Sequence, residues 1–302
     1  MSLERPSRQG PDAKALIESS EGITHKKLLA QFDNPHTLEL NGKPVDVVDI
    51  VPEDLKTEVP TLVIPGFSAT PEALKDSIIR IAEAGRRVIS AYAPHGIPSE
   101  RAEGDLPPAE MRKLELLLSL LEKKELQKIN VIANSEGAIS VAVAAVLYPE
   151  KFENIVLVEP AGIVGTVSAL ELIRRTLADA ADQASNKDLG RAQYPAPRSV
   201  GIKSILSNLV ATVQEIRSIG QADITPALAE IHSKGIGVSI IHAVDDKVFS
   251  MEKVLQMVHA NMLDGFYSIK GNHMSLYERD PIGRAAEAAL SALEFKKANA
   301  KK

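Results

Sequence analysis

The chain has 302 residues and a formal charge of −5, with 44% apolar and 25% charged residues, a balance close to that of average globular domains. Acidic and basic residues are interspersed along the chain, and no cluster of basic residues stands out, so we expect no nucleic-acid partner. The chain contains no cysteine, which excludes disulfides, thiolate metal sites and a cysteine nucleophile.

The first segment, Met1 to Lys14, is polar and interrupted by proline and glycine. It lacks the apolar run of a secretory signal, and no apolar stretch elsewhere approaches the length of a membrane span. We therefore expect a cytoplasmic protein with no membrane span.

The sequence predicts a helix from Ala13 to Phe32, and two short strands follow within His36 to Val51. These strands flank Asn41-Gly42, the dipeptide that best suits a two-residue hairpin turn. The sequence therefore predicts an antiparallel entry to a sheet.

Apolar strands then alternate with helical segments. The strands read as continuous apolar runs of four to six residues, which indicates burial on both faces of a parallel sheet with helices covering each face. The predicted strands are Thr61-Ile64, Arg87-Ala91, Ile129-Ala133, Ile155-Glu159, Gly237-Ala243 and Gly265-Ile269, and the predicted helices are Pro71-Ala84, Pro108-Glu122, Ala138-Leu147, Met251-Met262 and Pro281-Lys297.

The alternation stops between Ala161 and Lys234, where Ser168-Gln183 and Val200-Ile219 show helical spacing and no strand intervenes. We interpret this block as a helical insertion in an α/β core. The predicted organisation is an N-terminal helical extension (1–35), a core made of 36–160 and 235–302, and a helical lid (161–234).

A serine lies where the strand Ile129-Ala133 passes directly into a helix. A nucleophile on such a sharp turn needs small residues two positions before and after it, and Ala133 and Gly137 stand there around Ser135. The backbone N–H of Glu136, at the start of the helix, would face negative charge developing on a substrate oxygen. The simpler alternative is that Ser135 only caps this helix.

Four motifs, taken in order, resemble those of the α/β-hydrolase superfamily. The first two are Val63-Ile64-Pro65-Gly66-Phe67-Ser68, similar to the family's oxyanion loop, and the serine turn. The last two are Ile240 to Phe249, similar to the segment that carries the catalytic acid, and Gly271-Asn272-His273-Met274, similar to the histidine loop. The resemblance extends from about Val47 to the C-terminal helix and implies the α/β-hydrolase fold.

The resemblance implies a catalytic triad of Ser135, His273 and Asp246, in the chain order that α/β-hydrolases use. In such a triad the imidazole takes the serine proton and a carboxylate holds the imidazole in the correct tautomer. It also implies an oxyanion hole formed by the N–H groups of Phe67 and Glu136. Asp245 is an open alternative for the acid, and Glu159, after the preceding strand, is a weaker one.

Two positions depart from the family pattern. Ala133 replaces the first glycine of G-x-S-x-G, which is sterically mild, and Tyr92 stands where the family frequently has aspartate. Tyr92 and the unusual loop Pro94 to Ser99 affect the rim of the pocket more than the triad.

The resemblance implies a serine hydrolase that cleaves small-molecule carboxylic esters or lactones through an acyl-enzyme, and no cofactor or metal is expected. The serine argues against the epoxide hydrolases and haloalkane dehalogenases of the same fold, which use aspartate. Alternatives are an acyltransferase or perhydrolase, a carbon–carbon bond hydrolase, and a binding protein or receptor with little turnover. Apolar residues offered by the insertion for an acyl pocket are Ile163, Val164, Leu170, Ile173, Ile205, Leu206 and Leu209.

Overall fold

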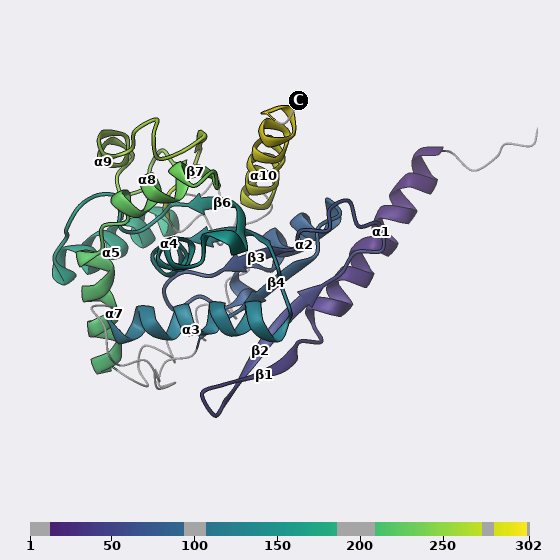
Figure 1. Ribbon diagram of the computed structural model, residues 1–302, viewed down its shortest axis with the longest axis horizontal. Coiled ribbons are helices and arrows are strands. Elements are labelled where there is room, and N and C mark those ends of the chain that lie inside the picture. Colours follow the sequence, from purple (N-terminus) through teal and green to yellow (C-terminus); the bar gives the residue numbers. More distant parts are fainter. Residues whose placement is uncertain (1–12, 94–106, 186–208, 274–280, 301–302) are drawn as a thin grey trace, which may run out of the picture.

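The computed structural model describes residues 13–93, 107–185, 209–273 and 281–300 (Figure 1). The strands are β1 (His36–Leu40), β2 (Lys43–Ile50), β3 (Thr61–Ile64), β4 (Val88–Ala91), β5 (Ile129–Asn134), β6 (Phe152–Val158), β7 (Gly237–Ala243) and β8 (Gly265–Ile269). The helices are α1 (Ala13–Phe32), α2 (Lys75–Glu83), α3 (Pro108–Lys123), α4 (Gly137–Leu147), α5 (Ala169–Ser185), α7 (Leu209–Gln221), α8 (Thr225–Ser233), α9 (Met251–Met257) and α10 (Pro281–Ala300). Short 3₁₀ turns cover Pro71–Leu74 and Pro149–Lys151.

The strands form one mixed sheet in the order β1-β2-β4-β3-β5-β6-β7-β8. The pairs β1-β2 and β2-β4 are antiparallel, and the remaining neighbours are parallel. Asn41 and Gly42 join β1 to β2 with φ angles of 49° and 73°, as a tight hairpin turn requires. The predicted parallel sheet with an antiparallel N-terminal hairpin is therefore confirmed.

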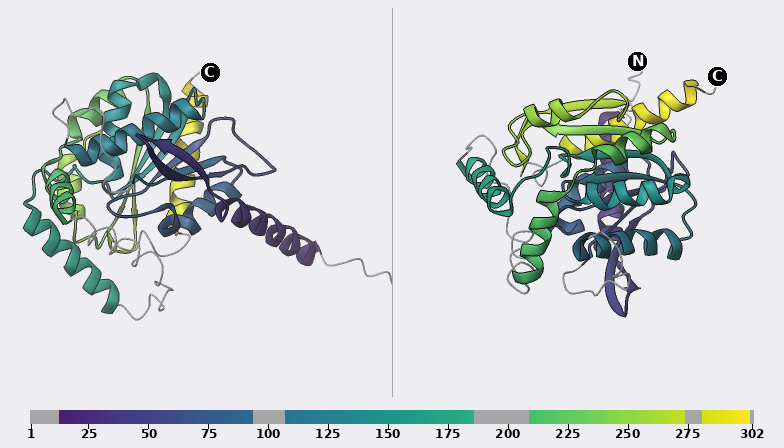
Figure 2. Two further views of the ribbon diagram at one scale, coloured as in Figure 1. Left: turned by 90° about the horizontal axis from the view of Figure 1, so that it is seen from below. Right: turned by 60° about the vertical axis from the view of Figure 1, so that its left-hand side comes forward.

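Helices cover both faces of the sheet (Figures 1 and 2). Buried residues of α1, α2 and α10 pack together on one face, and those of α3, α4 and α8 pack on the other. Every residue of β4, β5 and β7 is buried, as predicted for these mainly apolar strands. The expected burial does not hold for β8, which is partly exposed because it lies at the edge of the sheet.

The parallel strands bring their carboxyl ends to one edge of the sheet. Ser135 follows β5, Glu159 follows β6, and the loops after β7 and β8 carry Asp246 and His273. Ligands of open α/β sheets bind outside these ends, so the topology itself brings chemically active side chains into one region.

The described part of the segment between β6 and β7, residues 159–185 and 209–236, contains helices and no strand, as expected. Within it, α5 contacts α7, α7 contacts α3, and α8 lies against α4 and β7. The boundaries 161–234 for a lid, and 1–35 for an N-terminal extension, remain predictions.

Several element boundaries differ from the sequence prediction. Strand β6 begins at Phe152 and not at Ile155, and α9 ends at Met257 because Val258 adopts an extended conformation with ψ of 137°. Helix α8 had no separate prediction. The first part of the predicted helix Val200-Ile219 lies outside the described residues.

Within the residues that the structure describes, no helix combines the length and the apolar character needed to cross a membrane.

A buried guanidinium joins the last helix to the start of β4. Arg86 is 4% exposed and donates from Nη1 and Nη2 to the two carboxylate oxygens of Glu294 in α10, at 2.7 and 2.8 Å. Its Nη2 also donates to Ser291 Oγ at 3.1 Å, and Asn130 of β5 donates to Glu294 Oε1 at 3.1 Å. This network fixes α10 against the sheet.

Replacing Arg86 by Met should lower the free energy of unfolding by about 2–3 kcal/mol, because the partly buried Glu294 carboxylate loses its charged donors. Urea unfolding followed by circular dichroism measures the change. The control Lys234→Met removes a more exposed pair with Glu230 at 2.6 Å. It should change the free energy by less than about 1 kcal/mol. Equal urea concentrations at the unfolding midpoint for both variants would contradict a structural role of Arg86.

Candidate active site

Ser135 occupies a strained turn at the end of β5. Its φ angle is 48°, which is uncommon for a residue with a side chain. The Ser135 N–H donates to the carbonyl of Val158 at 2.9 Å, and its own carbonyl accepts from the N–H of Ala161 at 3.0 Å. Hydrogen bonds to the segment at the end of β6 therefore hold the strained residue in place.

Close packing around this turn explains its small residues. A Cβ atom on Gly137 would lie 3.0 Å from the carbonyl oxygens of Ile64 and Pro65, a tight contact, so glycine lets α4 begin close to β3. A Cβ on Gly66 would lie 3.0 Å from Ser135 Cβ. The loop after β3, which continues to Phe67, is therefore in direct contact with the serine turn.

The structure brings Ser135, His273 and Asp246 together in a hydrogen-bonded row. Ser135 Oγ lies 3.1 Å from His273 Nε2, and His273 Nδ1 lies 2.9 Å from Asp246 Oδ2. The three side chains are 7%, 7% and 4% exposed, so the row is shielded from bulk water. A serine and a carboxylate on the two nitrogens of one imidazole is the geometry needed to activate a hydroxyl.

The loop after β7 holds the Asp246 carboxylate in a fixed orientation. Its Oδ1 accepts from the backbone N–H groups of Val248 and Phe249 at 2.7 and 2.8 Å, which leaves Oδ2 for His273. The neighbouring Asp245 is exposed to solvent. Asp246, and not Asp245, is thus the aspartate that contacts the histidine.

Two aromatic rings, those of His242 and Phe249, lie next to the row of Ser135, His273 and Asp246. His242 of β7 is fully buried, and its Nε2 donates to the carbonyl of Phe249 at 2.7 Å. Burial lowers the pKa of His242 in spite of Asp246 nearby, so this imidazole is neutral near pH 7. The Phe249 ring makes an edge-to-face contact with the His273 ring at 5.3 Å between centroids.

A second carboxyl group lies beside the histidine. Glu159, fully buried after β6 with φ of 47°, has its Oε2 3.3 Å from His273 Nδ1. Burial raises the pKa of Glu159 well above its usual value, and the charges of Asp246 and Asp179 raise it further. These surroundings favour the neutral form of Glu159, and Asp246, which receives two backbone N–H bonds, is the better charged partner of His273.

Asp179 of α5 reaches the same site, and the sequence had not suggested it. This fully buried side chain accepts at Oδ1 from the backbone N–H of Lys247 at 3.0 Å and from that of His273 at 3.3 Å. Its own carbonyl accepts from Asn272 Nδ2 at 3.2 Å. Asp179 thus links the helical insertion to both loops that carry the acid and the histidine.

The two predicted oxyanion donors come from two segments that adjoin the serine. Glu136 is the residue before the first turn of α4, where backbone N–H groups have no partner within the helix. Phe67 lies in the loop whose Gly66 packs on Ser135, and its side chain is partly buried against the core. Their roles as donors remain a prediction.

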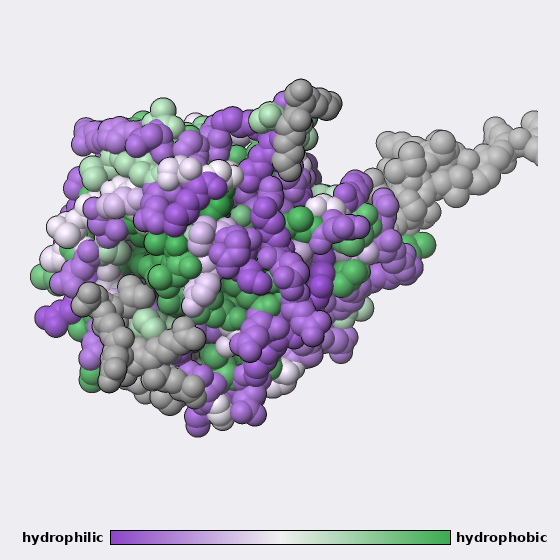
Figure 3. Space-filling view, viewed as in Figure 1, coloured by the Kyte–Doolittle hydropathy of each residue, from purple (hydrophilic) through white to green (hydrophobic). Residues whose placement is uncertain are grey.

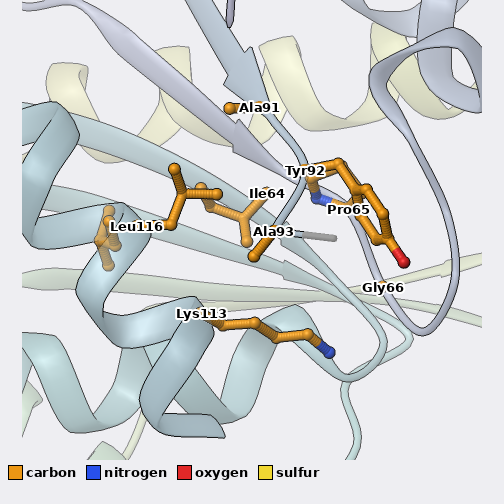
Figure 4. Close-up of a pocket in the computed structure, with 9 residues that line it drawn as sticks. Ile64, Pro65, Gly66, Ala91, Tyr92, Ala93, Lys113 and Leu116 are labelled. Atoms are coloured by element: carbon orange, nitrogen blue, oxygen red, sulfur yellow. The ribbon is translucent and has the colours of Figure 1, made fainter. Parts of the chain in front are cut away.

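A small pocket lies next to this loop. It is lined by Ile64, Pro65, Gly66, Ala91, Tyr92, Ala93, Lys113, Leu116 and Leu117. Figure 4 shows Tyr92 and Pro65 on one side of it and the Lys113 side chain of α3 on the other. Tyr92, the departure from the family pattern, therefore does line a pocket rim, while the loop Pro94 to Ser99 lies outside the described residues.

The residues expected to line an acyl pocket divide into three groups. Ile163 and Val164 are buried in the main core, while Leu170 and Leu209 are 78% and 59% exposed and Ile173 is 38% exposed. Ile205 and Leu206 lie outside the described residues. In Figure 3 apolar residues gather near the middle of the face shown, with hydrophilic residues around them.

The described residues include one group of three side chains whose donor atoms could hold a metal ion, Glu159, Asp246 and His273. The ligand atoms lie within 4.8 Å of one another. The same Nδ1 and Oδ2 atoms already form the 2.9 Å hydrogen bond of the row, and we assign the group to that role.

Comparison with known proteins identifies the fold. No family model matches the chain, and no curated protein sequence matches it. Among solved structures, a bacterial membrane phospholipase A has a TM-score of 0.62 at 18% identity, covering 93% of this chain and 92% of that one. An enol-lactonase from Burkholderia xenovorans LB400 has a TM-score of 0.62 at 13% identity, covering 87% of this chain and 100% of that one.

A bromoperoxidase from Bacillus anthracis has a TM-score of 0.59 at 20% identity, covering 87% of this chain and 100% of that one. At these identities the likeness is one of fold. It confirms the predicted α/β-hydrolase fold.

The electrostatics of the row can be tested directly. Burial lowers the pKa of His273, but the charge and hydrogen bond of Asp246 and the charge of Asp179 outweigh it, so the pKa lies above the usual 6.5. Asp246→Asn removes a negative charge that favours the imidazolium, and the pKa should fall. NMR titration of the ring, assigned with His273→Gln, measures the shift.

Glu159→Gln is the matched control, because it replaces a carboxyl group that is already neutral and should leave the pKa of His273 nearly unchanged. A larger downward shift with Glu159→Gln than with Asp246→Asn would mean that Glu159 is the charged partner.

Proposed function

We propose that this chain, which has the α/β-hydrolase fold, is a serine hydrolase that cleaves carboxylic esters or lactones through an acyl-enzyme on Ser135. The observation that carries the proposal is the row in which Ser135 Oγ lies 3.1 Å from His273 Nε2 and His273 Nδ1 lies 2.9 Å from Asp246 Oδ2. The positive φ of Ser135 and the loop packed on it support a reactive site, since backbone strain clusters at such sites.

In the first half of the reaction, Ser135 Oγ attacks the carbonyl carbon while His273 Nε2 accepts the hydroxyl proton. The Asp246 carboxylate stabilises the imidazolium that forms. The N–H groups of Glu136 and Phe67 stabilise the negative oxygen of the tetrahedral intermediate. When the intermediate collapses, the bond to the leaving oxygen breaks, His273 returns its proton to that oxygen, and the acyl group stays on Ser135.

In the second half, His273 accepts a proton from water, whose oxygen attacks the acyl carbon. A second tetrahedral intermediate collapses with release of the carboxylic acid and reprotonation of Ser135. With a lactone, the alcohol and the acid leave as one molecule. The pKa of His273 lies above 6.5, so the neutral base is lost as pH falls and activity should decline on the acid side of neutrality.

Two structural neighbours bear the names phospholipase and enol-lactonase, which denote hydrolysis of ester bonds. Among the described residues of the insertion, three exposed leucines, Leu170, Leu177 and Leu209, are available to an apolar acyl group. Acyl transfer to another acceptor and carbon–carbon cleavage use the same three residues. A meta-cleavage product hydrolase is also a structural neighbour, at 15% identity and a TM-score of 0.58, and a substrate panel separates these reactions.

The expected partner is a small-molecule substrate. The cytoplasmic location that the sequence suggests also remains a proposal.

The first experiment combines turnover and covalent labelling. Wild type and Ser135→Ala are incubated with p-nitrophenyl esters of graded chain length, a lactone panel and a fluorophosphonate that reacts with activated serines. We expect labelling and ester turnover in wild type only, with a loss in kcat of at least about 10³-fold in the variant. Folded wild type that neither reacts nor labels would favour the binding-protein alternative, and labelling without hydrolysis of any ester or lactone would favour another acyl or carbon–carbon substrate.

Asp179 should affect the same activity from the insertion. Asp179→Ala removes the acceptor that holds the backbone of Lys247 and His273, and misplacement of the imidazole should lower kcat/KM by about ten-fold or more. Asp179→Asn keeps the Oδ1 acceptor and should retain most of the rate. Because Asn removes a charge that raises the pKa of His273, it should also move the acid limb of the pH profile to lower pH. Equal activity of wild type and the Ala variant would contradict this role.

A further inference from the structure

A second cluster of buried charged and polar side chains contacts the serine turn through Glu136. Its members come from three elements: Glu136 from the turn, Glu110, Arg112 and Lys113 from α3, and Glu215 and Ser218 from α7. All six residues are between 0% and 8% exposed. None of them takes part in the reaction proposed above through its side chain.

Lys113 is the centre of this cluster. Its Nζ forms ion pairs with Glu136 Oε2 and, at 2.8 Å, with Glu215 Oε1. Arg112 also contacts Glu215 Oε1, at 3.4 Å, and donates from Nε to the carbonyl of Ala93 at 3.2 Å. One ammonium thus connects the residue that follows the nucleophile to a helix of the insertion.

The charges of the cluster balance when one carboxyl group is neutral. Three glutamates face one lysine and one arginine, and Glu110 forms hydrogen bonds with Ser218 Oγ, at 3.1 Å, and with the Glu136 carboxyl group. Burial raises the pKa of Glu110 more than the charge of Lys113 lowers it. Burial also opposes the charge on Lys113, but the surrounding carboxylates raise its pKa and keep it protonated. Burial likewise raises the pKa of Glu136 well above its usual value. Glu110 and Glu136 therefore share one proton, and the two cations neutralise the single negative charge of that pair and the charge of Glu215.

A buried cluster of charges is not the most stabilising way to fill the interior of a protein. Buried ion pairs are often no more stabilising than apolar side chains of the same size, because the charges must leave water. An arrangement that adds little to stability but fixes geometry fits a site where a backbone group must be held accurately. The backbone group of Glu136 is the N–H that follows Ser135.

The residues on both sides of Glu136 are already held in place, which restricts the position of the Glu136 N–H. Gly137 packs against Ile64 and Pro65, and Ser135 is held through Val158 and Ala161. The side chain of Glu136, anchored by Lys113, fixes the remaining residue of the turn. Figure 4 shows Lys113 extending from α3 toward the loop that carries Gly66.

We propose that Lys113 is a positioning residue that links α7 of the insertion, through Glu215, to the oxyanion N–H of Glu136. The inference rests on the proposed hydrolase function. It predicts that the oxyanion donor is correctly placed only when α7 is packed on α3. A displaced donor weakens an interaction made in the transition state, so kcat should fall more than KM rises.

The test uses the full-length protein and four variants. Lys113→Met removes the ammonium at similar side-chain length, Glu215→Gln weakens only the α7 end of the link, and the double variant combines them. Arg86→Met is the matched control, because it also removes a buried cation bound to carboxylates but lies at the far end of β4 from the serine. Fluorophosphonate titration gives the concentration of reactive sites, and kcat per site and KM are measured on one p-nitrophenyl ester.

We expect kcat per site to fall at least about ten-fold in Lys113→Met, with KM changed less than about three-fold, since loss of one oxyanion donor typically lowers kcat by 10²–10³. Glu215→Gln should lower kcat by a smaller factor and have no further effect on top of Lys113→Met, as coupled residues behave. Arg86→Met should keep kcat per site at the wild-type value.

The inference is overturned if Lys113→Met and Glu215→Gln keep wild-type kcat per site, or if their effects simply multiply in the double variant. If Lys113→Met does not fold, Glu215→Gln alone decides, because it preserves the shape of the side chain. Failure of the proposed function looks different, since wild type itself would then neither label nor turn over.

Discussion

The imidazole of His273 must face a hydroxyl with one nitrogen and a carboxylate with the other, and the architecture meets this requirement. The three groups lie after β5, β7 and β8, and 138 positions separate the serine from the histidine. Parallel strands bring these points to a common edge. The strained φ of Ser135 then directs its side chain toward the ring. If residue 135 had a helical or an extended backbone conformation, its side chain would not point toward the His273 ring.

The environment, more than the residue type, separates the two acids beside His273. Asp246 accepts two backbone N–H bonds and one from the imidazole, so its negative charge is compensated inside the protein. Glu159 is buried, and the charges of Asp246 and Asp179 oppose its ionisation, so these surroundings favour its neutral form. Two carboxyl groups within reach of one imidazole nitrogen can therefore take different protonation states and different roles.

Local patterns in the sequence were enough to predict most of the fold, and the motifs that resemble those of α/β-hydrolases pointed to the three residues of the central row. Asn41-Gly42 sets the hairpin by its preference for positive φ, and the apolar runs of β3, β7 and β8 match their strands to the residue. Asp179 and Glu215 were missed because each acts through contacts with residues more than 65 positions away, and neither belongs to a local motif. The predicted helix Met251-Met262 was too long because extended Val258 ends α9, which helical periodicity alone does not show.

The helices between β6 and β7 are attached to the site at two separate points. Asp179 of α5 holds the backbone of the acid and histidine loops, and Glu215 of α7 is paired with Lys113 beside the serine turn. Swinging α7 away as a rigid flap would leave the buried Lys113 ammonium without Glu215, and breaking a buried ion pair costs about 3–5 kcal/mol. Swinging α5 away would remove the acceptor of the Lys247 and His273 N–H groups. Asp179 and Glu215 therefore tie the two helices of the insertion to the hydrogen-bonded row and to the serine turn.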